Sequence, residues 1–432
     1  MHDPYDRGAT GVCRRGGGPR ATPDPTRAGA GVERAAAACL ALAACGADDG
    51  AGAEDAVRRD SAGVEIVRLP AASPGKDARF GVSERPRVSI GSVDGPPEQQ
   101  LTRVPEAVLL GDGRILAVNS GSQELRAYGP DGEHLATWGS EGEGPGEFQN
   151  RMWAGRTAGD SVVAWDASAG SLSVFGPGGG FSREARVPVG GMFPRAVGLF
   201  GDGTLVVRKG WDTGAMFAGG TGTRRDTGTY VRVRRDGGVV DTLGSYPGDE
   251  SFVLASESRM RMQGIPFGRR AFFAVGDSLY HRAGSHAWEV RSYRPDGTLV
   301  RVVRRPTGSR PVTEEMKEAY RRSRLEDAGD AEARDALRDV FEATPWGDEA
   351  PALAGLEVGS DGTIWVRRWR PPGAEGEVWT ALGPDGSLRG RLRLPGRVRA
   401  VAFAADRVAV VRHDELDVEH LEVHRLVPPG GA

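Results

Sequence analysis

Short runs of alternating apolar and polar residues, separated by glycine-containing turns, recur along this chain from about residue 104 onward. The clearest example is 104–148, where four such runs are separated by Asp-Gly, Asn-Ser-Gly-Ser and Pro-Asp-Gly. Alternation with a period of two predicts strands, and Asp-Gly between two such runs predicts a tight hairpin because glycine adopts positive φ without steric cost. Segment 104–148 therefore predicts one four-stranded antiparallel sheet.

The same four-stranded unit recurs along the chain. Residues 112–128 align without a gap with residues 277–293. The aspartate of the first turn stands at six places: Asp112, Asp160, Asp202, Asp277, Asp361 and Asp406. Spacings of 48, 42 and 45 residues match one propeller blade each, and spacings of 75 and 84 match a blade plus an insertion. The sequence thus predicts an all-β fold, a six-bladed β-propeller of four-stranded antiparallel blades. A two-sheet sandwich is the alternative.

One part of the chain has a helical pattern instead. Residues 311–345 contain two apolar stripes at helical spacing, and Thr313 is suited to cap the first helix because two acidic residues follow it. We expect two short amphipathic helices, inserted between blades four and five and packed on one face of the ring. Their apolar stripes predict core packing, with a surface for docking a partner as the alternative.

The last blade has only three clear strand patterns, between residues 398 and 427. A strand from the beginning of the folded body would supply the missing fourth position and cover the edge where the two chain ends meet. Two segments have the right pattern, 63–69 and 86–90. We favour 63–69.

The chain begins with what we interpret as an export signal. Residues 35–45 are small and apolar, too few to span a bilayer but as long as the apolar core of a signal peptide. Their end, Leu42-Ala43-Ala44-Cys45, looks like a bacterial lipobox, which would make Cys45 the lipidated first residue. A chance alanine-rich helix is the alternative. The predicted organisation is a leader and signal peptide at 1–45, a flexible tether at 46–60 and a propeller at 61–428.

The cysteine positions and the charge balance of the chain restrict the classes of partner that we expect. The three cysteines, Cys13, Cys39 and Cys45, all precede the expected body, which leaves no thiol there for a disulfide, for zinc or for catalysis. After residue 45 the chain carries 50 basic and 55 acidic side chains, a balance that does not favour nucleic acid. We expect a monomer that touches the membrane only through its lipid anchor, facing the periplasm or the cell surface.

The segment Gly142-Glu-Gly-Pro-Gly-Glu-Phe148, together with the Asp-Gly and Pro-Asp-Gly turns, resembles the NHL-like six-bladed propellers. The body also looks like the bacterial six-bladed propeller lipoproteins, which begin with a segment like Asp60-Ser-Ala-Gly-Val64. The resemblance implies a non-catalytic scaffold that binds a protein or a ligand at the cell envelope.

Candidate binding residues lie on the expected innermost strands, next to a central channel. They are Glu106, Arg195, Arg269, Arg270 and Arg399, with Arg151 and Trp153 on the same kind of strand. Several arginines around one glutamate suit a small anionic ligand, because guanidinium groups make bidentate contacts to oxyanions. The alternatives are ion pairs between blades and solvated charges at the rim. The register of these strands decides which side chains face the channel, and the sequence does not fix it.

No catalytic residue and no cofactor are expected. The alternative is a metal-dependent hydrolase or lactonase with its site in the channel, because the related gluconolactonase-like propellers hold a divalent metal with Glu, Asn and Asp side chains. Glu106, Asn119 and Asp166 are the residues that could imitate such a set of oxygen ligands for Ca²⁺.

Overall fold

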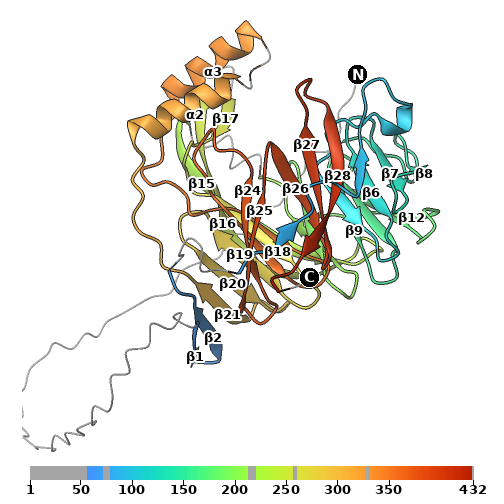
Figure 1. Cartoon of the computed structure of the whole chain (residues 1–432), viewed down its shortest axis with the longest axis horizontal. Helices are drawn as coiled ribbons and strands as arrows, with labels where there is room; N and C mark the ends of the chain where they lie inside the picture. Colours follow the sequence, from blue (N-terminus) through green and yellow to red (C-terminus); the bar gives the residue numbers. More distant parts are fainter. Residues whose placement is uncertain are drawn as a thin grey trace, which may run out of the picture. The chain divides into compact units, whose positions relative to one another are not determined.

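The structure is a computed structural model that describes residues 56–71, 78–150, 152–212, 220–255, 260–326, 328 and 330–430. The expected leader, its lipidation site Cys45 and the greater part of the expected tether lie outside these residues. In the described part the fold is mostly β, built from sheets of four or more strands, as in a propeller (Figure 1). We number the sheets one to six by the order of their first strands in the chain, setting aside the early strands β1 to β4.

Sheets one and two are simple antiparallel units of four strands each. Sheet one consists of β5 (Ala107–Leu109), β6 (Ile115–Asn119), β7 (Glu124–Tyr128) and β8 (His134–Trp138), and a short 3-10 helix, η1 (Pro97–Gln99), precedes it. Sheet two consists of β9 (Met152–Arg156), β10 (Val162–Asp166), β11 (Ser171–Phe175) and β12 (Phe181–Arg186).

Sheets three and four are larger. Sheet three consists of β13 (Arg195–Leu199), β14 (Leu205–Arg208), the long hairpin β15 (Gly222–Val233) and β16 (Val239–Ala255), and β17 (Met260–Gly264). Sheet four consists of β18 (Ala271–Val275), β19 (Tyr280–Gly284), β20 (Glu289–Tyr293) and β21 (Leu299–Arg304), extended by β2 (Val64–Arg68) and β1 (Val57–Ser61).

Sheets five and six follow the helical segment. Sheet five consists of β22 (Leu353–Val358), β23 (Ile364–Arg368), β24 (Glu377–Leu382) and β25 (Leu388–Leu394). Sheet six consists of β26 (Val398–Phe403), β27 (Arg407–His413) and β28 (Glu419–Val427), completed by β4 (Val88–Ile90) and β3 (Gly81–Val82), which both pair with β28.

The first turns of sheets one, three and five have the chemistry that the sequence predicts. At the first turn of sheet one, Gly113 has a φ of 98°, and the Asp112 carboxylate accepts a hydrogen bond of 3.1 Å from the backbone N–H of Arg114. Asp202 does the same for Thr204 at 2.9 Å. Aspartate and glycine thus fix these turns together: the carboxylate satisfies a backbone donor, and glycine supplies the left-handed conformation.

The hydrophobic core is divided into layers between consecutive sheets. Leu116 of sheet one packs in one cluster with Val162 of sheet two, and corresponding clusters join sheets two to three, three to four, four to five and five to six. A sixth cluster contains Leu421 of sheet six and Ile115 of sheet one. The middle strands of a sheet are therefore buried on both faces, as in β6 and β10, whereas the outer strand β12 of sheet two is exposed or half-buried. The last layer brings sheet six against sheet one.

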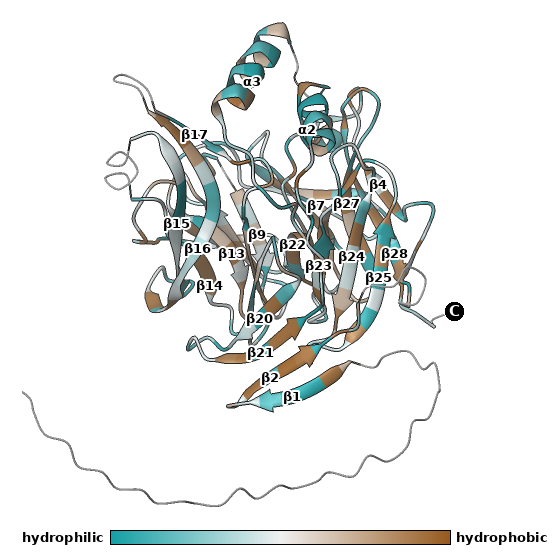
Figure 2. Ribbon diagram, turned by 90° about the vertical axis from the view of Figure 1, so that its left-hand side faces the viewer, coloured by the Kyte–Doolittle hydropathy of each residue, from teal (hydrophilic) through white to brown (hydrophobic). Residues whose placement is uncertain are grey.

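The strand that completes sheet six is not the one we favoured. Segment 63–69 contains β2, which pairs in parallel with β21 of sheet four, so the assignment of 63–69 to the last blade is wrong. Segment 86–90 contains β4, and Ile90 lies opposite Leu421 in an antiparallel pair with β28. The expected tether at 46–60 is also too long, because β1 begins at Val57. Figure 2 shows β1 and β2 alongside β21.

Two helices lie between sheets four and five in the chain, α2 (Glu314–Glu326) and α3 (Ala331–Ala343). The Thr313 hydroxyl accepts a 3.3 Å hydrogen bond from the backbone N–H of Met316, as expected for a capping residue. Phe267, which follows β17, contacts the ring of Tyr320 of α2 and the ring of Trp346, which follows α3, at centroid distances of 5.7 and 6.0 Å. The helices therefore pack, through an aromatic cluster, on the segment between β17 and β18. Among the described residues, no helix is both long and apolar enough to cross a membrane.

Candidate functional site

One cavity of about 920 Å³ is lined by the first strand of every sheet: β5, β9, β13, β18, β22 and β26. Each of these strands is an edge of its sheet, with a hydrogen-bonded neighbour on one side only. Successive sheets bring these edges together around one space, which we call the channel. Its lining residues come from distant parts of the chain, and the side chains near the beginnings of the six strands decide its chemistry.

The structure brings four of the five candidate residues to the channel. Glu106, Arg195, Arg270 and Arg399 line it, and so does Trp153. Arg269 does not: its backbone N–H and its guanidinium both meet Glu250, at 2.8 and 3.6 Å, so its assignment to the channel is wrong. Both residues precede β18, and their backbone N–H groups bind different partners, Glu250 for Arg269 and Ser285 for Arg270, so the two side chains lie in different places. Arg151 lies outside the described residues.

Three of the channel arginines occupy equivalent positions in their sheets. Each stands seven residues before the aspartate of the next turn, as shown by the pairs Arg195 and Asp202, Arg270 and Asp277, and Arg399 and Asp406. Trp153 stands at the same distance before Asp160. In these four repeats, the position seven residues before the turn aspartate therefore predicts a residue that lines the channel.

A second channel glutamate, Glu357, was missed by the sequence reasoning. It lies within β22, in the run Leu353–Val358, and lines the channel together with Glu106. Burial raises the pKa of Glu106 to about 8, and the charge of Glu357 adds to that shift, while Arg195 and Arg399 oppose it. Burial likewise raises the pKa of Glu357 to about 7. Glu106 is half-buried, and its raised pKa keeps it largely protonated at neutral pH, so that it can donate a hydrogen bond. Glu357 is exposed to the channel, where water weakens the effect of burial on its pKa.

Two arginines of the channel are fixed in its wall. Arg399 donates hydrogen bonds of 2.5 and 2.7 Å to the backbone carbonyls of Val104 and Pro105, which joins sheet six to the segment before β5. Arg367 donates at 2.5 Å to the carboxylate of Glu377 and at 2.8 Å to the carbonyl of Ala354. Their guanidinium groups are already engaged, so these residues mainly shape the channel.

Arg195 and Arg270 are different. Both side chains are exposed to the channel, and within the described residues no hydrogen bond or ion pair holds either guanidinium group. Arg195 nevertheless lies close enough to Glu106 and Glu357 to lower the pKa of both. A guanidinium group with five free donors in such a space is suited to an oxyanion.

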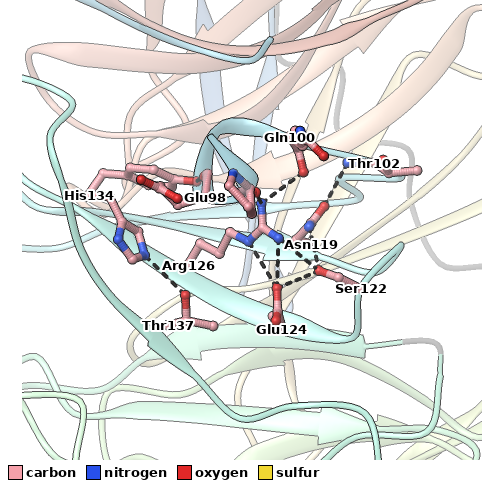
Figure 3. Close-up of polar contacts among 11 residues, drawn as sticks. Glu98, Gln100, Thr102, Asn119, Ser122, Glu124, Arg126, His134 and Thr137 are labelled. Atoms are coloured by element: carbon pink, nitrogen blue, oxygen red, sulfur yellow. Dashed lines mark hydrogen bonds and ion pairs between the residues drawn. The ribbon is translucent and has the colours of Figure 1, made fainter. Parts of the chain in front are cut away.

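The three residues of the metal alternative do not form one site. Asn119 and Asp166 do not line the channel with Glu106. Asn119 accepts a 2.7 Å hydrogen bond from the backbone N–H of Thr102 and donates one of 2.6 Å to Ser122, in the polar network around Arg126 that Figure 3 shows. Asp166 accepts from four backbone N–H groups, with distances of 2.5 to 3.4 Å. Their oxygens stabilise turns, and no cluster of three His, Cys, Asp or Glu side chains suited to a metal exists in the described part of the chain.

Comparison with known proteins does not add a function. No protein-family model matches the chain, and no curated protein does. Among solved structures, an exported protein from Bacteroides fragilis is 9% identical with a TM-score of 0.47, and the match covers 84% of this chain and 99% of that one. Virginiamycin B lyase from Staphylococcus aureus is 10% identical with a TM-score of 0.40, covering 81% and 99%. A gluconolactonase from Xanthomonas campestris is 10% identical with a TM-score of 0.38, covering 76% and 87%. Likenesses this weak carry no argument, and the function is therefore inferred from the chain's own residues.

Proposed function

We propose that this protein is an exported, lipid-anchored, six-bladed β-propeller whose channel binds a small anionic ligand without converting it. The six sheets would be the six blades, with apolar layers between neighbours and a last layer that joins sheet six to sheet one. Export and lipid attachment rest on the sequence around Cys45, and the cell envelope is the corresponding location.

The observation that carries the binding function is the free guanidinium group of Arg195. It lines the channel beside Glu106 and Glu357, whose pKa values are raised to about 8 and about 7, so that Glu106 above all carries little negative charge at neutral pH. The positive charge of Arg195 and Arg270 is therefore not cancelled by these neighbours. An anion in the channel would gain charge-assisted hydrogen bonds from arginine and hydrogen bonds from protonated carboxyl groups.

The channel also suits a small organic molecule rather than a lone ion. Its volume of about 920 Å³ lies at the upper end of common ligand sites, and Trp153, Phe272 and Trp379 add apolar surface to its lining. Aromatic walls with a few charged groups are the usual composition of a pocket that orients a ligand by its polar end. The proposal includes no chemical step.

The test is a binding screen with the full-length protein against a panel of small aromatic and aliphatic carboxylates and phosphate esters, followed by calorimetry. We expect binding of at least one class of anion, weakened about tenfold or more by Arg195→Gln because a hydrogen bond to a charged group is lost. Arg269→Gln is the matched control, since its side chain meets Glu250 and not the channel. The proposal fails if no anion of the panel binds, or if Arg195→Gln and Arg269→Gln have equal effects.

A further inference from the structure

A row of three polar side chains crosses sheet three at the channel. In the register of the strands, Arg195 of β13 lies opposite Arg208 of β14, and Arg208 lies opposite Tyr230 of β15. Residues directly opposite each other on paired strands share one face of the sheet. All three side chains line the channel. The row therefore places two guanidinium groups and one phenol on a single face.

Tyr230 is the most informative member of this row. Its side chain is only 7% exposed, and its ring stacks on Phe273 of sheet four with a centroid distance of 4.1 Å and an interplanar angle of 9°. Within the described part of the chain, no hydrogen bond occupies its hydroxyl. The hydroxyl oxygen is not completely enclosed by protein atoms. The hydroxyl of a buried tyrosine usually has a partner. For the hydroxyl of Tyr230, a ligand in the channel is the partner that remains.

Arg208 is likewise available. Its guanidinium lies over the ring of Trp211 at 5.7 Å, and among the described residues it makes no hydrogen bond or ion pair. The guanidinium of Arg208 lies close to the backbone of β15 at Gly228, which has no side chain. A Cβ atom at position 228 would come within 2.6 Å of the Nε atom of Arg208. A larger residue at position 228 would displace the guanidinium, so the glycine keeps the group where it is.

The electrostatic surroundings of the row are positive. Burial raises the pKa of Tyr230, the charges of Arg208, Arg282 and Arg195 oppose this shift, and the charge of Asp249 adds to it. Of the four charges that act most strongly on the hydroxyl, three are cationic and one is anionic, and Asp226 also lines the channel. Asp249 already accepts a 2.8 Å hydrogen bond from the backbone N–H of Ala271. Tyr230 stays a neutral donor, and the excess of positive charge favours a ligand with more than one negative charge.

We propose that the row Arg195, Arg208 and Tyr230 binds the phosphoryl group of a small phosphate ester. This inference rests on the proposed function, and it names the ligand class for the same channel. A phosphoryl group carries about two negative charges at neutral pH and three acceptor oxygens. It can engage two guanidinium groups and one hydroxyl at the same time, whereas a carboxylate has only two oxygens. The apolar lining of the channel would take the rest of the molecule.

The experiment compares phenyl phosphate, benzoate and inorganic phosphate by calorimetry with the full-length protein at pH 7.5 and low salt. The two aromatic probes have the same ring and differ in the anionic group. We expect phenyl phosphate to bind about tenfold more tightly than benzoate, because it makes at least one more charge-assisted hydrogen bond. Inorganic phosphate that binds as tightly as phenyl phosphate would identify the free ion as the source of the phosphoryl group; weaker binding would identify an ester.

Tyr230→Phe is the decisive variant, because it keeps the stacked ring and removes only the hydroxyl. We expect it to weaken phenyl phosphate binding about tenfold and to leave benzoate within about twofold. Tyr246→Phe is the matched control: Tyr246 contacts the same aromatic cluster, but its hydroxyl donates to Tyr280 or Leu243 and it does not line the channel. Arg208→Gln should act like Tyr230→Phe.

The outcomes separate the two proposals. If benzoate binds in an Arg195-dependent way while phenyl phosphate is no tighter, the phosphoryl inference is wrong and the anion-binding channel stands. The phosphoryl inference is also wrong if Tyr230→Phe and Tyr246→Phe affect phenyl phosphate equally. If none of the probes binds the wild-type protein, the phosphoryl inference is overturned, and the wider panel of anions then decides the proposed function.

Discussion

The negative charge of Glu357 raises the pKa of Glu106, although Glu357 belongs to sheet five and Glu106 directly precedes the first strand of sheet one. The two carboxyl groups meet only because the sheets bring their first strands to one channel. Burial is the larger cause of both shifts, and it disfavours the ionised form of each group. This relationship makes both the stability and the binding of the protein depend on pH.

The first prediction concerns stability against pH. The folded state holds the proton of Glu106 more tightly than the unfolded chain, since its pKa rises from 4.5 to about 8. The stabilisation is therefore complete below about pH 4.5 and is lost as the pH rises through about 8. We expect Glu106→Gln to be similar to wild type at pH 5 and more stable at pH 9, by on the order of 1–3 kcal/mol.

Urea unfolding at several pH values measures this difference. The exposed Glu315 on α2 provides the control variant, Glu315→Gln, which should follow the wild-type curve. A constant difference between Glu106→Gln and wild type from pH 5 to pH 9 would contradict the assignment of a buried, protonated carboxyl group.

The second prediction concerns ligand affinity against pH. Benzoate stays ionised above pH 6, so any change in its affinity reports the protein. As Glu357 and Glu106 ionise through about pH 7 and about pH 8, the channel gains negative charge and its carboxyl groups lose their donors. We expect the dissociation constant of a bound anion to rise about tenfold or more between pH 6 and pH 9. In the double variant Glu106→Gln, Glu357→Gln it should change little, and a steep change there would disprove the role of the two carboxyl groups.

The repeat of the sequence predicted much of this architecture, because each turn depends on local chemistry. Asp112 and Gly113 can be recognised without any tertiary context, since aspartate binds the neighbouring backbone and glycine adopts positive φ. The choice of the closing strand is different. Segments 63–69 and 86–90 both alternate, and what separates them is a distant contact, the 2.7 Å ion pair of Glu65 with Arg301 of β21.

The channel residues show the same limit. Arg269 and Arg270 are neighbours of identical chemistry, and only the folded path of the segment before β18 sends Arg270 to the channel and Arg269 to Glu250. Glu357 was missed because it lies inside an apolar run, four residues before the turn aspartate Asp361, at a position where the other repeats have no common residue type. The position seven residues before the turn aspartate would have selected Arg195, Arg270 and Arg399 and rejected Arg269, but not Glu357.

The third prediction concerns the wall of the channel. The carboxylate of Glu377 is 8% exposed and accepts hydrogen bonds from Arg367 at 2.5 Å, from the indole of Trp379 at 3.0 Å and from the backbone of Ala400 at 3.0 Å. Glu377→Ala leaves the charge of Arg367 without its partner, so we expect a loss of about 3–5 kcal/mol in the free energy of unfolding.

A more conservative substitution of Glu377 distinguishes the effect of losing its charge from the effect of losing its side-chain volume. Glu377→Gln keeps the size of the side chain and an acceptor oxygen, so it should cost less than Glu377→Ala. Urea unfolding compares the two variants. If both variants lose less than about 1 kcal/mol in the free energy of unfolding, the hydrogen bonds between Arg367 and Glu377 do not stabilise the wall of the channel.

The fourth prediction concerns the contact of β4 with the last strand of the chain, β28. Ile90 of β4 is 3% exposed and lies opposite Leu421 of β28, in the apolar layer that joins sheet six to sheet one. Truncation to alanine removes three carbon atoms from this layer and leaves a cavity. We expect Ile90→Ala to cost about 2–4 kcal/mol in the free energy of unfolding, measured in urea.

The matched control is Val57→Ala, because Val57 lies on the outer strand β1 of sheet four and is 61% exposed. This change should stay within about 0.5 kcal/mol of wild type. The comparison also tests the reassignment of the two early segments. If β4 completes sheet six, the core position in 86–90 must be far more sensitive than the edge position in β1. Equal sensitivity at Ile90 and Val57 would mean that β4 does not connect the first and last sheets, and the channel would lose the closed wall on which the binding argument depends.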